Sequence, residues 1–337
     1  MEEKQNILIL GAGNWGTTFA RLLADKHIES TLWFRDPIHF QETSSTRINT
    51  KYLPGIDLSS DIHLTDSLSS LPTARLVVLA IPANAIRDFL INNLALLPKN
   101  AIYLSLAKGL ELKTGKRISE VLQEVLPDES KIACLSGPNI AHEIAERKPA
   151  TAVVVAHCPK VSTYLQNLVS CSYFRAYTNT DMAGVEISGA LKNVIAIAAG
   201  ICQELKLGDN SLAALITRGI AEIARYGMAF GANPLTFMGV AGVGDLSVTC
   251  MSGLSRNNRL GHLLARGVTL EDAIKQTKMV VEGISTCETV TRTAKKMGIY
   301  MPICFAVHSI LFEKIAVQNA IASLMQNHLR EEMDRSL

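Results

Sequence analysis

The sequence lacks the cysteine and histidine spacings that mark disulfide frameworks and metal centres. Its seven cysteines form no C-x-x-C pair and are odd in number, and its eight histidines never occur as H-x-x-x-H. This usage is typical of reduced thiols in the cytoplasm, and neither zinc nor another transition metal is expected. The cysteines are Cys134, Cys158, Cys171, Cys202, Cys250, Cys287 and Cys304.

The chain also lacks a charge excess and a long apolar run. Its 33 basic and 31 acidic residues are interspersed and give a net charge of +2. No broad cationic field faces a nucleic-acid backbone, so nucleic acid is not an expected partner. The longest uninterrupted apolar run, VIAIAAGI at 194–201, is about half of a bilayer span, so no membrane span is expected. The N-terminal MEEKQ has neither the basic region nor the cleavage site of a signal peptide.

Length and composition predict two globular domains. The chain has 337 residues, of which 48% are hydrophobic and 19% charged, which is long and apolar enough for two cores. In the first half, apolar strand-like runs alternate with helical stretches, which predicts a mostly parallel sheet covered by helices on both faces. The runs are NILIL (6–10), STLWF (30–34), RLVVLAIP (75–82), AIYLSL (101–106), KIACLSGP (131–138), TAVVVA (151–156) and FRAYT (174–178).

The strand signal ends near residue 181, and the rest of the chain is expected to be a series of helices. The fold class is therefore α/β, with an N-terminal Rossmann-type sheet domain at 1–182 and an all-α C-terminal domain at 183–337. The expected helices of the second domain cover 184–205, 210–230, 255–267, 269–277, 284–298 and 302–314.

The stretch GAGNWG, residues 11–16, lies between the first strand and a helical stretch. In a dinucleotide cradle, Gly11 would make the tight turn, Gly13 would let the backbone approach a pyrophosphate, and Gly16 would let the helix pack on the strand. The N–H groups and the positive dipole at the start of the helix would then face the anion. A purely structural glycine turn is the alternative, and the flanking strand and helix favour the cradle.

The end of the second strand, about 20 residues further on, is where NAD and NADP are usually distinguished. An acid there holds the ribose hydroxyls of NAD, and an arginine accepts the 2′-phosphate of NADP. The sequence WFRDP offers Arg35 followed by Asp36. The sequence is therefore compatible with either cofactor, and charges that merely face solvent are the alternative.

The helical half contains three features that bear on chemistry. Lys192 lies in SGALKNVIAIAAGI among apolar helix positions, so it either has a buried partner or extends to the surface. Asp245, in AGVGDLSVTC, is either an exposed turn acid that caps a helix, which the local context favours, or an acid that faces a cleft. Ser255 is a good N-cap, and Arg256 and Asn257 follow it in a first turn where either a bound phosphate or solvent balances the cation.

Together with the glycine stretch, these segments resemble the NAD(P)-dependent glycerol-3-phosphate dehydrogenases of bacterial type. The resemblance covers nearly the whole chain. It implies a Rossmann domain followed by a helical domain like that of 6-phosphogluconate dehydrogenase. The matching segments are GAGNWGT, AKGLE, SGPNIA, ALKNVIAIAAG, ALITRG, GVGDLSVTC, SRNNR and VVEG.

The resemblance also implies a role for each matched residue. Lys192 is the catalytic acid/base, and Asp245 lies beside it. The implied substrate-binding residues are Lys108, Gly137, Asn139, Lys192, Asp245, Ser255, Arg256 and Asn257. The implied dinucleotide-binding residues are Gly11, Gly13, Asn14, Trp15, Gly16, Arg35, Lys108, Ala141, Arg256, Val280 and Glu282. Asn139 stands where bacterial members often have Ser or Thr, and Asn14 replaces a frequent Ser.

The implied reaction is the reversible reduction of dihydroxyacetone phosphate to sn-glycerol 3-phosphate by NADH or NADPH, which supplies glycerophospholipid synthesis. For the reverse direction the pKa of Lys192 should fall from about 10.4 towards neutrality. Burial and Lys108 would lower it, and Asp245 would raise it. A cytoplasmic homodimer without a metal is expected. The alternatives are a sister dehydrogenase for a β-hydroxyacid or ketopantoate, and a non-catalytic dinucleotide sensor.

Overall fold

The computed structural model describes residues 6–68, 74–98, 100–126, 131–277 and 280–326. MEEKQ, assessed above for signal-peptide features, lies outside the described residues. The chain divides into two compact units. A sheet unit comprises Met1–Ala107 and Ile118–Met182, and a helical unit comprises Lys108–Arg117 and Ala183–Leu337. The segment Lys108–Arg117, which was expected in the first domain, packs with the helical unit.

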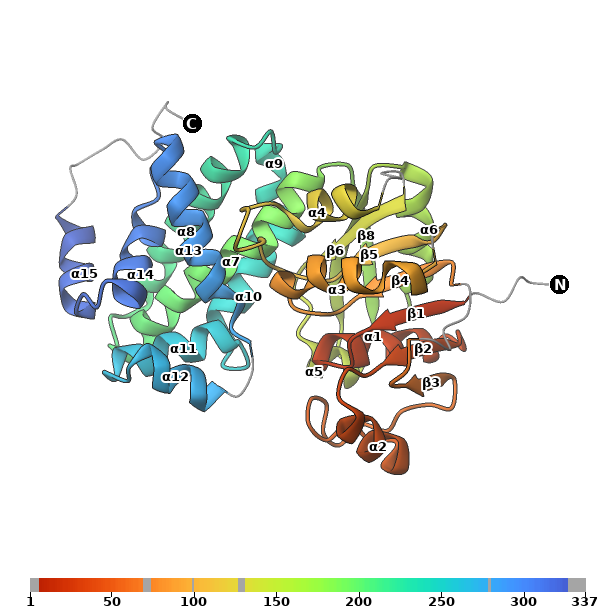
Figure 1. Ribbon diagram of the computed structural model, residues 1–337. Helices are drawn as coiled ribbons and strands as arrows, with labels where there is room; N and C mark the ends of the chain where they lie inside the picture. The colour runs from red at the N-terminus through yellow and green to blue at the C-terminus, as the bar shows by residue number, and fades with distance from the viewer. Residues whose placement is uncertain (1–5, 69–73, 99, 127–130, 278–279, 327–337) are drawn as a thin grey trace. The chain divides into compact units, whose positions relative to one another are not determined.

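The sheet unit contains one sheet of eight strands within the described residues, in the order β3-β2-β1-β4-β5-β6-β7-β8 (Figure 1). Neighbouring strands are parallel except β6 and β7, which are antiparallel. The predicted mostly parallel sheet is thereby confirmed. The strands are β1 (Ile7–Leu10), β2 (Ser30–Trp33), β3 (Ile62–Thr65), β4 (Leu76–Leu79), β5 (Ile102–Ser105), β6 (Ile132–Ser136), β7 (Ala150–Ala156) and β8 (Phe174–Asn179).

Both faces of this sheet are buried, which explains the continuous apolar runs. Along β1, Ile7 and Ile9 belong to the core on one face, and Leu8 and Leu10 belong to the core on the other. Helices α1 (Asn14–Ala24) and α6 (Pro159–Val169) pack in the first core, and α3 (Ile86–Asn93) and α4 (Ile118–Val125) pack in the second. The remaining helical segments are α2 (Pro37–Thr46), α5 (Ala141–Ala145), η1 (Ala83–Ala85) and η2 (Leu94–Leu96).

Strand β3 was not expected from the sequence. Its residues IHLT have one fully buried side chain, Ile62, because the strand lies at the edge of the sheet. An edge strand needs fewer apolar residues than a central strand does. A periodicity search for buried strands therefore passes over it.

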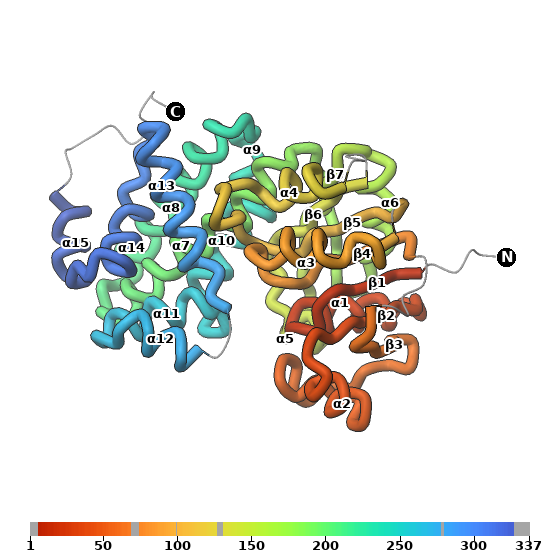
Figure 2. Tube along the Cα trace, viewed as in Figure 1, coloured from red at the N-terminus to blue at the C-terminus, as the bar shows by residue number. Residues whose placement is uncertain are grey.

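The helical unit is organised around one long apolar helix, α7 (Met182–Glu204). Its core also takes side chains from α8 to α15 and from Leu110, and Figure 2 traces these helices through the unit. The other helices are α8 (Asp209–Met228), α9 (Pro234–Phe237), α10 (Asp245–Met251), α11 (Arg256–Ala265), α12 (Leu270–Thr277), α13 (Glu282–Met297), α14 (Pro302–Phe312) and α15 (Val317–Met325). The predicted helices are present, and α9, α10 and α15 were not expected.

Glycines bring α7 and α11 into backbone contact. A Cβ atom at Gly200 would lie 2.0 Å from the main-chain oxygen of Asn258, and one at Gly261 would lie 2.1 Å from that of Ile197. Distances this short leave no room for a side chain, so the crossing requires glycine at both positions. The close approach brings the first turn of α11 near α7.

Among the described residues, two stretches of the helical unit are long and apolar enough, by length and composition alone, to cross a membrane. They are Met182–Glu204 and Pro234–Met251. In the first, 94% of the tested window is buried inside the structure, as expected for the core helix of a globular unit. The second is interrupted at Gly242, whose backbone is not helical, and contains the buried carboxylate of Asp245.

Candidate functional site

The turn between β1 and α1 uses its three glycines in different ways. Gly11 has a φ of 112°, and a Cβ atom there would lie 2.7 Å from the main-chain oxygen of Ala80. A Cβ at Gly16 would lie 2.0 Å from the oxygen of Gly11. A Cβ at Gly13, by contrast, would meet no atom within 4 Å. Gly11 and Gly16 are therefore needed by the fold, whereas Gly13 leaves the space that a closely approaching ligand requires.

The first turn of α1 has the properties of an anion site. Its N-cap is Gly13, no side chain caps it, and its first turn contains no acidic residue. Among the described atoms, Asn14 Oδ1 and Trp15 Nε1 are buried without a hydrogen-bond partner. Helix N–H groups and unpaired polar atoms beside an open backbone position fit the pyrophosphate of a dinucleotide. The residues present are thus suited to NAD or NADP.

At the end of β2, Arg35 is exposed and Asp36 is partly buried. The Asp36 side chain caps α2, accepting a hydrogen bond from the main-chain N–H of Ile38 at 3.1 Å. Its other oxygen lies 3.7 Å from Lys51 Nζ. Of the two residues expected to select the cofactor, Asp36 is therefore the one held by the fold, although its side chain remains 46% exposed.

Ala141 lies next to α1 within the sheet unit. Its main-chain oxygen accepts a hydrogen bond from Thr18 Oγ1 at 3.2 Å. Gly137, with a φ of 142°, and Asn139 lie between β6 and α5, just before it. The carboxyl ends of β1 and β6 meet at the same edge of the sheet, because β1, β4, β5 and β6 run parallel. Ligands of doubly wound sheets bind at this edge.

The helical unit contains a cluster of two lysines and one aspartate, of which Lys192 and Asp245 are buried. Lys192 Nζ, on α7, lies 2.5 Å from Asp245 Oδ1, and Lys108 Nζ lies 2.9 Å from Asp245 Oδ2. Lys192 is 6% exposed and Asp245 is 1% exposed. Of the alternatives that the sequence left open, the structure excludes an exposed turn acid at Asp245 and a lysine that extends to the surface at Lys192. Each has a charged partner, as burial requires.

The surroundings of Lys192 favour loss of its proton near neutral pH. Burial lowers the pKa of Lys192 to about 7, and this effect exceeds the opposing attraction of the Asp245 carboxylate. The Lys108 ammonium lowers the pKa further by repulsion. A group with a pKa near the working pH can both donate and accept a proton.

Sequence reasoning missed Thr249, which orients the Lys192 ammonium. Thr249 Oγ1 accepts a hydrogen bond from Lys192 Nζ at 2.8 Å and donates one to the main-chain oxygen of Asp245 at 2.6 Å. Asp245 and Thr249 are four residues apart on α10, so they lie on the same side of that helix. This spacing could have identified the threonine, but the glycines before Asp245 obscured the helix.

Asn193 was also missed, and it connects the cluster to α11. Its Nδ2 donates to the main-chain oxygen of Lys108 at 3.1 Å, and its Oδ1 accepts from Asn257 Nδ2 at 2.9 Å. Asn257 Oδ1 in turn accepts from the main-chain N–H of Gly283 at 2.9 Å. Two buried amides thus hold the start of α11 and α13 against the segment that carries Lys108.

The first turn of α11 has the expected form. Ser255 caps it by accepting a hydrogen bond from the main-chain N–H of Asn258 at 3.3 Å. Arg256 is exposed, and its Nη1 donates to the main-chain oxygen of Val280 at 2.8 Å. Glu282, the last residue expected to contact the dinucleotide, is the first residue of α13. The two implied dinucleotide contacts Arg256 and Val280 are therefore neighbours, as binding of the same dinucleotide would require.

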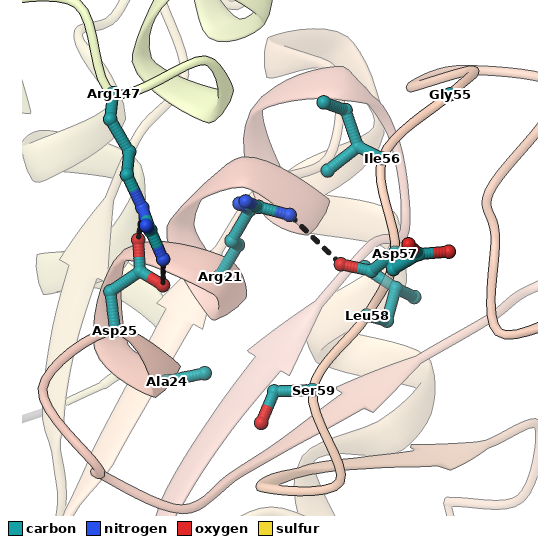
Figure 3. A pocket seen from close by; sticks show the side chains of 9 residues that line it. All are labelled: Arg21, Ala24, Asp25, Gly55, Ile56, Asp57, Leu58, Ser59 and Arg147. Atoms are coloured by element: carbon teal, nitrogen blue, oxygen red, sulfur yellow. Dashed lines mark hydrogen bonds and ion pairs between the residues drawn. The ribbon is translucent and has the colours of Figure 1, made fainter.

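A cavity of about 360 Å³ in the sheet unit lies elsewhere. Figure 3 shows that its wall includes the ion pair of Arg147 with Asp25 and the hydrogen bond from Arg21 to the main-chain oxygen of Asp57. Arg21 and Asp25 stand at the C-terminal end of α1, away from the glycine turn. None of the predicted site residues line this cavity. Within the described residues, no group of three or more His, Cys, Asp or Glu could hold a metal ion.

The doubly wound sheet, the glycine turn before α1 and the buried Lys–Asp cluster define a dinucleotide-dependent dehydrogenase. Two family models match the chain: the NAD-dependent glycerol-3-phosphate dehydrogenase N-terminus over residues 6–162, and the C-terminus of the same family over residues 181–322. The chain therefore belongs to the NAD-dependent glycerol-3-phosphate dehydrogenase family, as the sequence motifs predicted.

Individual relatives agree with this assignment. The glycerol-3-phosphate dehydrogenase (NAD(P)+) of Geobacter sp. (strain M21) is 42% identical over 97% of this chain and 99% of its own length. That of Geobacillus kaustophilus is 44% identical over 98% of this chain and 97% of its own length. The crystal structure of glycerol-3-phosphate dehydrogenase from Coxiella burnetii has a TM-score of 0.92 and 34% identity, and covers 96% of this chain and 99% of that chain.

Proposed function

We propose that this chain reduces dihydroxyacetone phosphate reversibly to sn-glycerol 3-phosphate, using NADH or NADPH, with Lys192 as the general acid and base. The buried contact between Lys192 and Asp245, at 2.5 Å, is the observation that carries the proposal. The family relationship and the glycine turn support dinucleotide-dependent oxidoreduction. The polar cluster adds a proton donor where a carbonyl reduction needs one.

Lys192 supplies and removes the proton of the reaction. Its ammonium donates to Asp245 and Thr249, which leaves one of its three N–H donors for the C2 oxygen of the substrate. As negative charge develops on that oxygen, the ammonium stabilises it and transfers a proton to it. In the reverse direction the neutral amine accepts the hydroxyl proton. Asp245 holds the amine in place in both directions.

The substrate phosphate is assigned to the first turn of α11. Ser255, Arg256 and Asn257 lie there, and this turn contains no acidic residue. A phosphate at this position would accept hydrogen bonds from helix N–H groups and from the Arg256 guanidinium. Lys108, Gly137 and Asn139 are proposed as further substrate contacts.

The dinucleotide is assigned to the glycine turn of the sheet unit. Gly11, Gly13 and Gly16 would form the cradle, with Asn14, Trp15 and Ala141 beside it, and Arg35 would face the adenosine ribose. Lys108, Arg256, Val280 and Glu282 are proposed as contacts from the helical unit. When bound, the reduced nicotinamide supplies the hydride that converts the carbonyl to an alcohol.

The experiment is to follow the absorbance of NADH and then of NADPH on addition of dihydroxyacetone phosphate. Unphosphorylated dihydroxyacetone and hydroxypyruvate are the comparison substrates. Oxidation that depends on the phosphate supports the proposal, and the ratio of the two rates gives the cofactor preference. Activity on hydroxypyruvate alone would point to a sister dehydrogenase. Dinucleotide binding without any oxidation would point to a non-catalytic sensor.

We further propose that the chain acts in the cytoplasm as a homodimer and supplies sn-glycerol 3-phosphate, the backbone of glycerophospholipids. The absence of disulfides among its seven free cysteines supports the location. Leu235 and Met238, which are 74% and 69% exposed, support an assembly, because exposed apolar side chains close together are often covered by a partner. Light scattering of the purified chain tests the dimer, and a monomer would refute it.

A further inference from the structure

After β5 the chain makes a hairpin, Lys108–Arg117, that packs with the helical unit. Leu110 pairs with Arg117 in an antiparallel bridge, and the main-chain N–H of Glu111 donates to the oxygen of Lys116 at 2.9 Å. Gly115, with a φ of 77°, forms the turn. Lys108 is the first residue of this 108–117 hairpin. The placement of the hairpin therefore determines where the Lys108 ammonium lies relative to Asp245.

Apolar and main-chain contacts fix one strand and the tip of the hairpin. Leu110 is 1% exposed and belongs to the core of the helical unit. Arg292 Nη2, from α13, donates to the main-chain oxygen of Leu112 at 2.5 Å. Gly115 packs against α13, because a Cβ atom at this position would lie 3.5 Å from the side chains of Thr289 and Thr293. These contacts hold the hairpin on α13.

An ion pair fixes the other strand of the hairpin on α7. Arg117 Nη1 lies 3.3 Å from Glu186 Oε2, and the two side chains are 18% and 4% exposed. Glu186 stands on the same helix as Lys192, six residues before it. The desolvation cost of burying such a pair is about as large as the attraction between its charges, so the pair adds little to stability. It does fix the relative positions of the two segments that it joins. It ties the hairpin directly to the helix that carries the proposed acid/base.

We propose that Arg117 is a positioning residue, whose ion pair with Glu186 fixes the 108–117 hairpin on α7 and so holds the Lys108 ammonium against Asp245. The inference rests on the proposed function, because the position of Lys108 matters for turnover if the Lys192 cluster performs the reaction. Arg117 acts through Lys108. Its loss therefore has a consequence for Lys192 that can be measured.

The expected consequence is a change in the proton affinity of Lys192. Among the described residues, Lys192 Nζ donates to the Asp245 carboxylate and to the Thr249 hydroxyl of α10. The Lys108 ammonium of the hairpin and the Cys250 thiol of α10 also interact with it electrostatically. If the hairpin moves, the repulsion from Lys108 weakens while the attraction of Asp245 remains. Lys192 then holds its proton to higher pH. The limb of the pH–rate profile that reports Lys192 should move to higher pH in both directions of the reaction.

The test compares Arg117→Ala with the matched control Arg266→Ala. Arg266 also pairs with a glutamate of α7, Glu204, at 2.7 Å, but at the far end of the helix. Arg117→Ala should lower kcat for dihydroxyacetone phosphate about tenfold, because displacement of a catalytic cluster by an ångström has effects of this order or larger. It should also move the pH limb upward. Arg117→Lys should restore both in part, and Arg266→Ala should match the wild type.

Glu186→Gln is the second variant, because it keeps the shape of the pair and removes the charge of the buried carboxylate. It should show the same direction of change as Arg117→Ala, and circular dichroism checks that each variant is folded. If folded Arg117→Ala and Glu186→Gln both keep the wild-type kcat and pH limb, the positioning role is overturned. If the wild type itself fails to oxidise either dinucleotide with dihydroxyacetone phosphate, the proposed function fails instead, so the two failures are distinguishable.

Discussion

Replacing Lys192 with methionine tests the centre of the proposed mechanism. Lys192→Met keeps the length of the side chain and removes its charge. Asp245 retains Lys108 as a partner at 2.9 Å, so the change does not leave an isolated buried carboxylate. Loss of a general acid of this kind costs about 10²- to 10⁴-fold in kcat. Dinucleotide binding should be unchanged, because Lys192 is not among the proposed dinucleotide contacts.

The same substitution should change how stability depends on pH. The Lys192 ammonium loses its proton near pH 10.5 in the unfolded chain and near pH 7 in the folded chain. Between these values the unfolded state binds more protons, so the contribution of Lys192 makes the folded state more stable as pH rises. Lowering the pKa from 10.5 to about 7 corresponds to about 5 kcal/mol in all, of which about 2 kcal/mol is recovered between pH 7 and pH 9. Lys192→Met should lack this gain.

Three measurements decide the prediction. Steady-state kinetics with dihydroxyacetone phosphate gives kcat, the fluorescence of NADH or NADPH gives dinucleotide affinity, and urea denaturation at pH 7 and pH 9 gives the free energy of unfolding. Near-normal kcat in a folded Lys192→Met protein would refute the acid/base role. An identical pH dependence of stability in variant and wild type would refute the buried, easily deprotonated lysine.

Three further predictions concern other parts of the chain. Gly13→Ala should fold as the wild type does, because a Cβ there meets no atom within 4 Å, yet it should bind NADH and NADPH more weakly; unchanged affinity in a binding titration would contradict the cradle. Arg256→Ala should raise KM for dihydroxyacetone phosphate about ten- to hundredfold and lower kcat as well, since a charged hydrogen bond is lost; an unchanged KM would make this turn an ordinary surface. Burial raises the pKa of Glu222, which accepts hydrogen bonds from the N–H groups of Ile303 and Cys304, to about 7. The folded state therefore binds more protons than the unfolded state between pH 4.5 and 7, so the contribution of Glu222 to stability should fall by about 2 to 3 kcal/mol from pH 5 to pH 8. The free energy of unfolding of Glu222→Gln, measured by denaturation, should rise by this amount relative to that of the wild type over the same range.

The sheet unit could be predicted from its sequence because its strands are buried on both faces. Runs such as LVVL at 76–79 and IACLS at 132–136 are entirely buried, and such runs differ clearly from surface sequence. The edge strand at 62–65 escaped because it buries a single side chain fully. Helix α10 escaped for another reason, since the glycines at 242 and 244 pack against the chain near Phe237 and Gly239 and suggest a loop by composition.

Those parts of the candidate site that depend on contacts between residues close in sequence could be predicted from the sequence. The glycine turn is largely of this kind. Gly16 packs on Gly11 of the same βα unit, and Gly13 leaves the space a ligand needs, whereas Gly11 also lies against Ala80, directly after β4. The burial of Asp245 was not predictable, because a helix-capping acid and a buried acid look alike in GVGDLSVTC. What distinguishes them is the pair of ammonium groups, Lys192 and Lys108, that come from 53 and 137 residues away in the sequence. No local pattern contains that information.

The balance of charges in this cluster gives Lys108 a part in proton transfer beyond contact with substrate. Burial alone would leave Lys192 a neutral amine at pH 7, and Asp245 alone would keep it an ammonium. With Lys108 on the opposite oxygen of Asp245, part of the carboxylate's attraction is offset, and the pKa of Lys192 settles at about 7. Both protonation states are then available at neutral pH, which a reversible reduction requires. The hairpin that carries Lys108 therefore belongs to the acid–base apparatus, although its residues come from between a strand and a helix of the sheet unit.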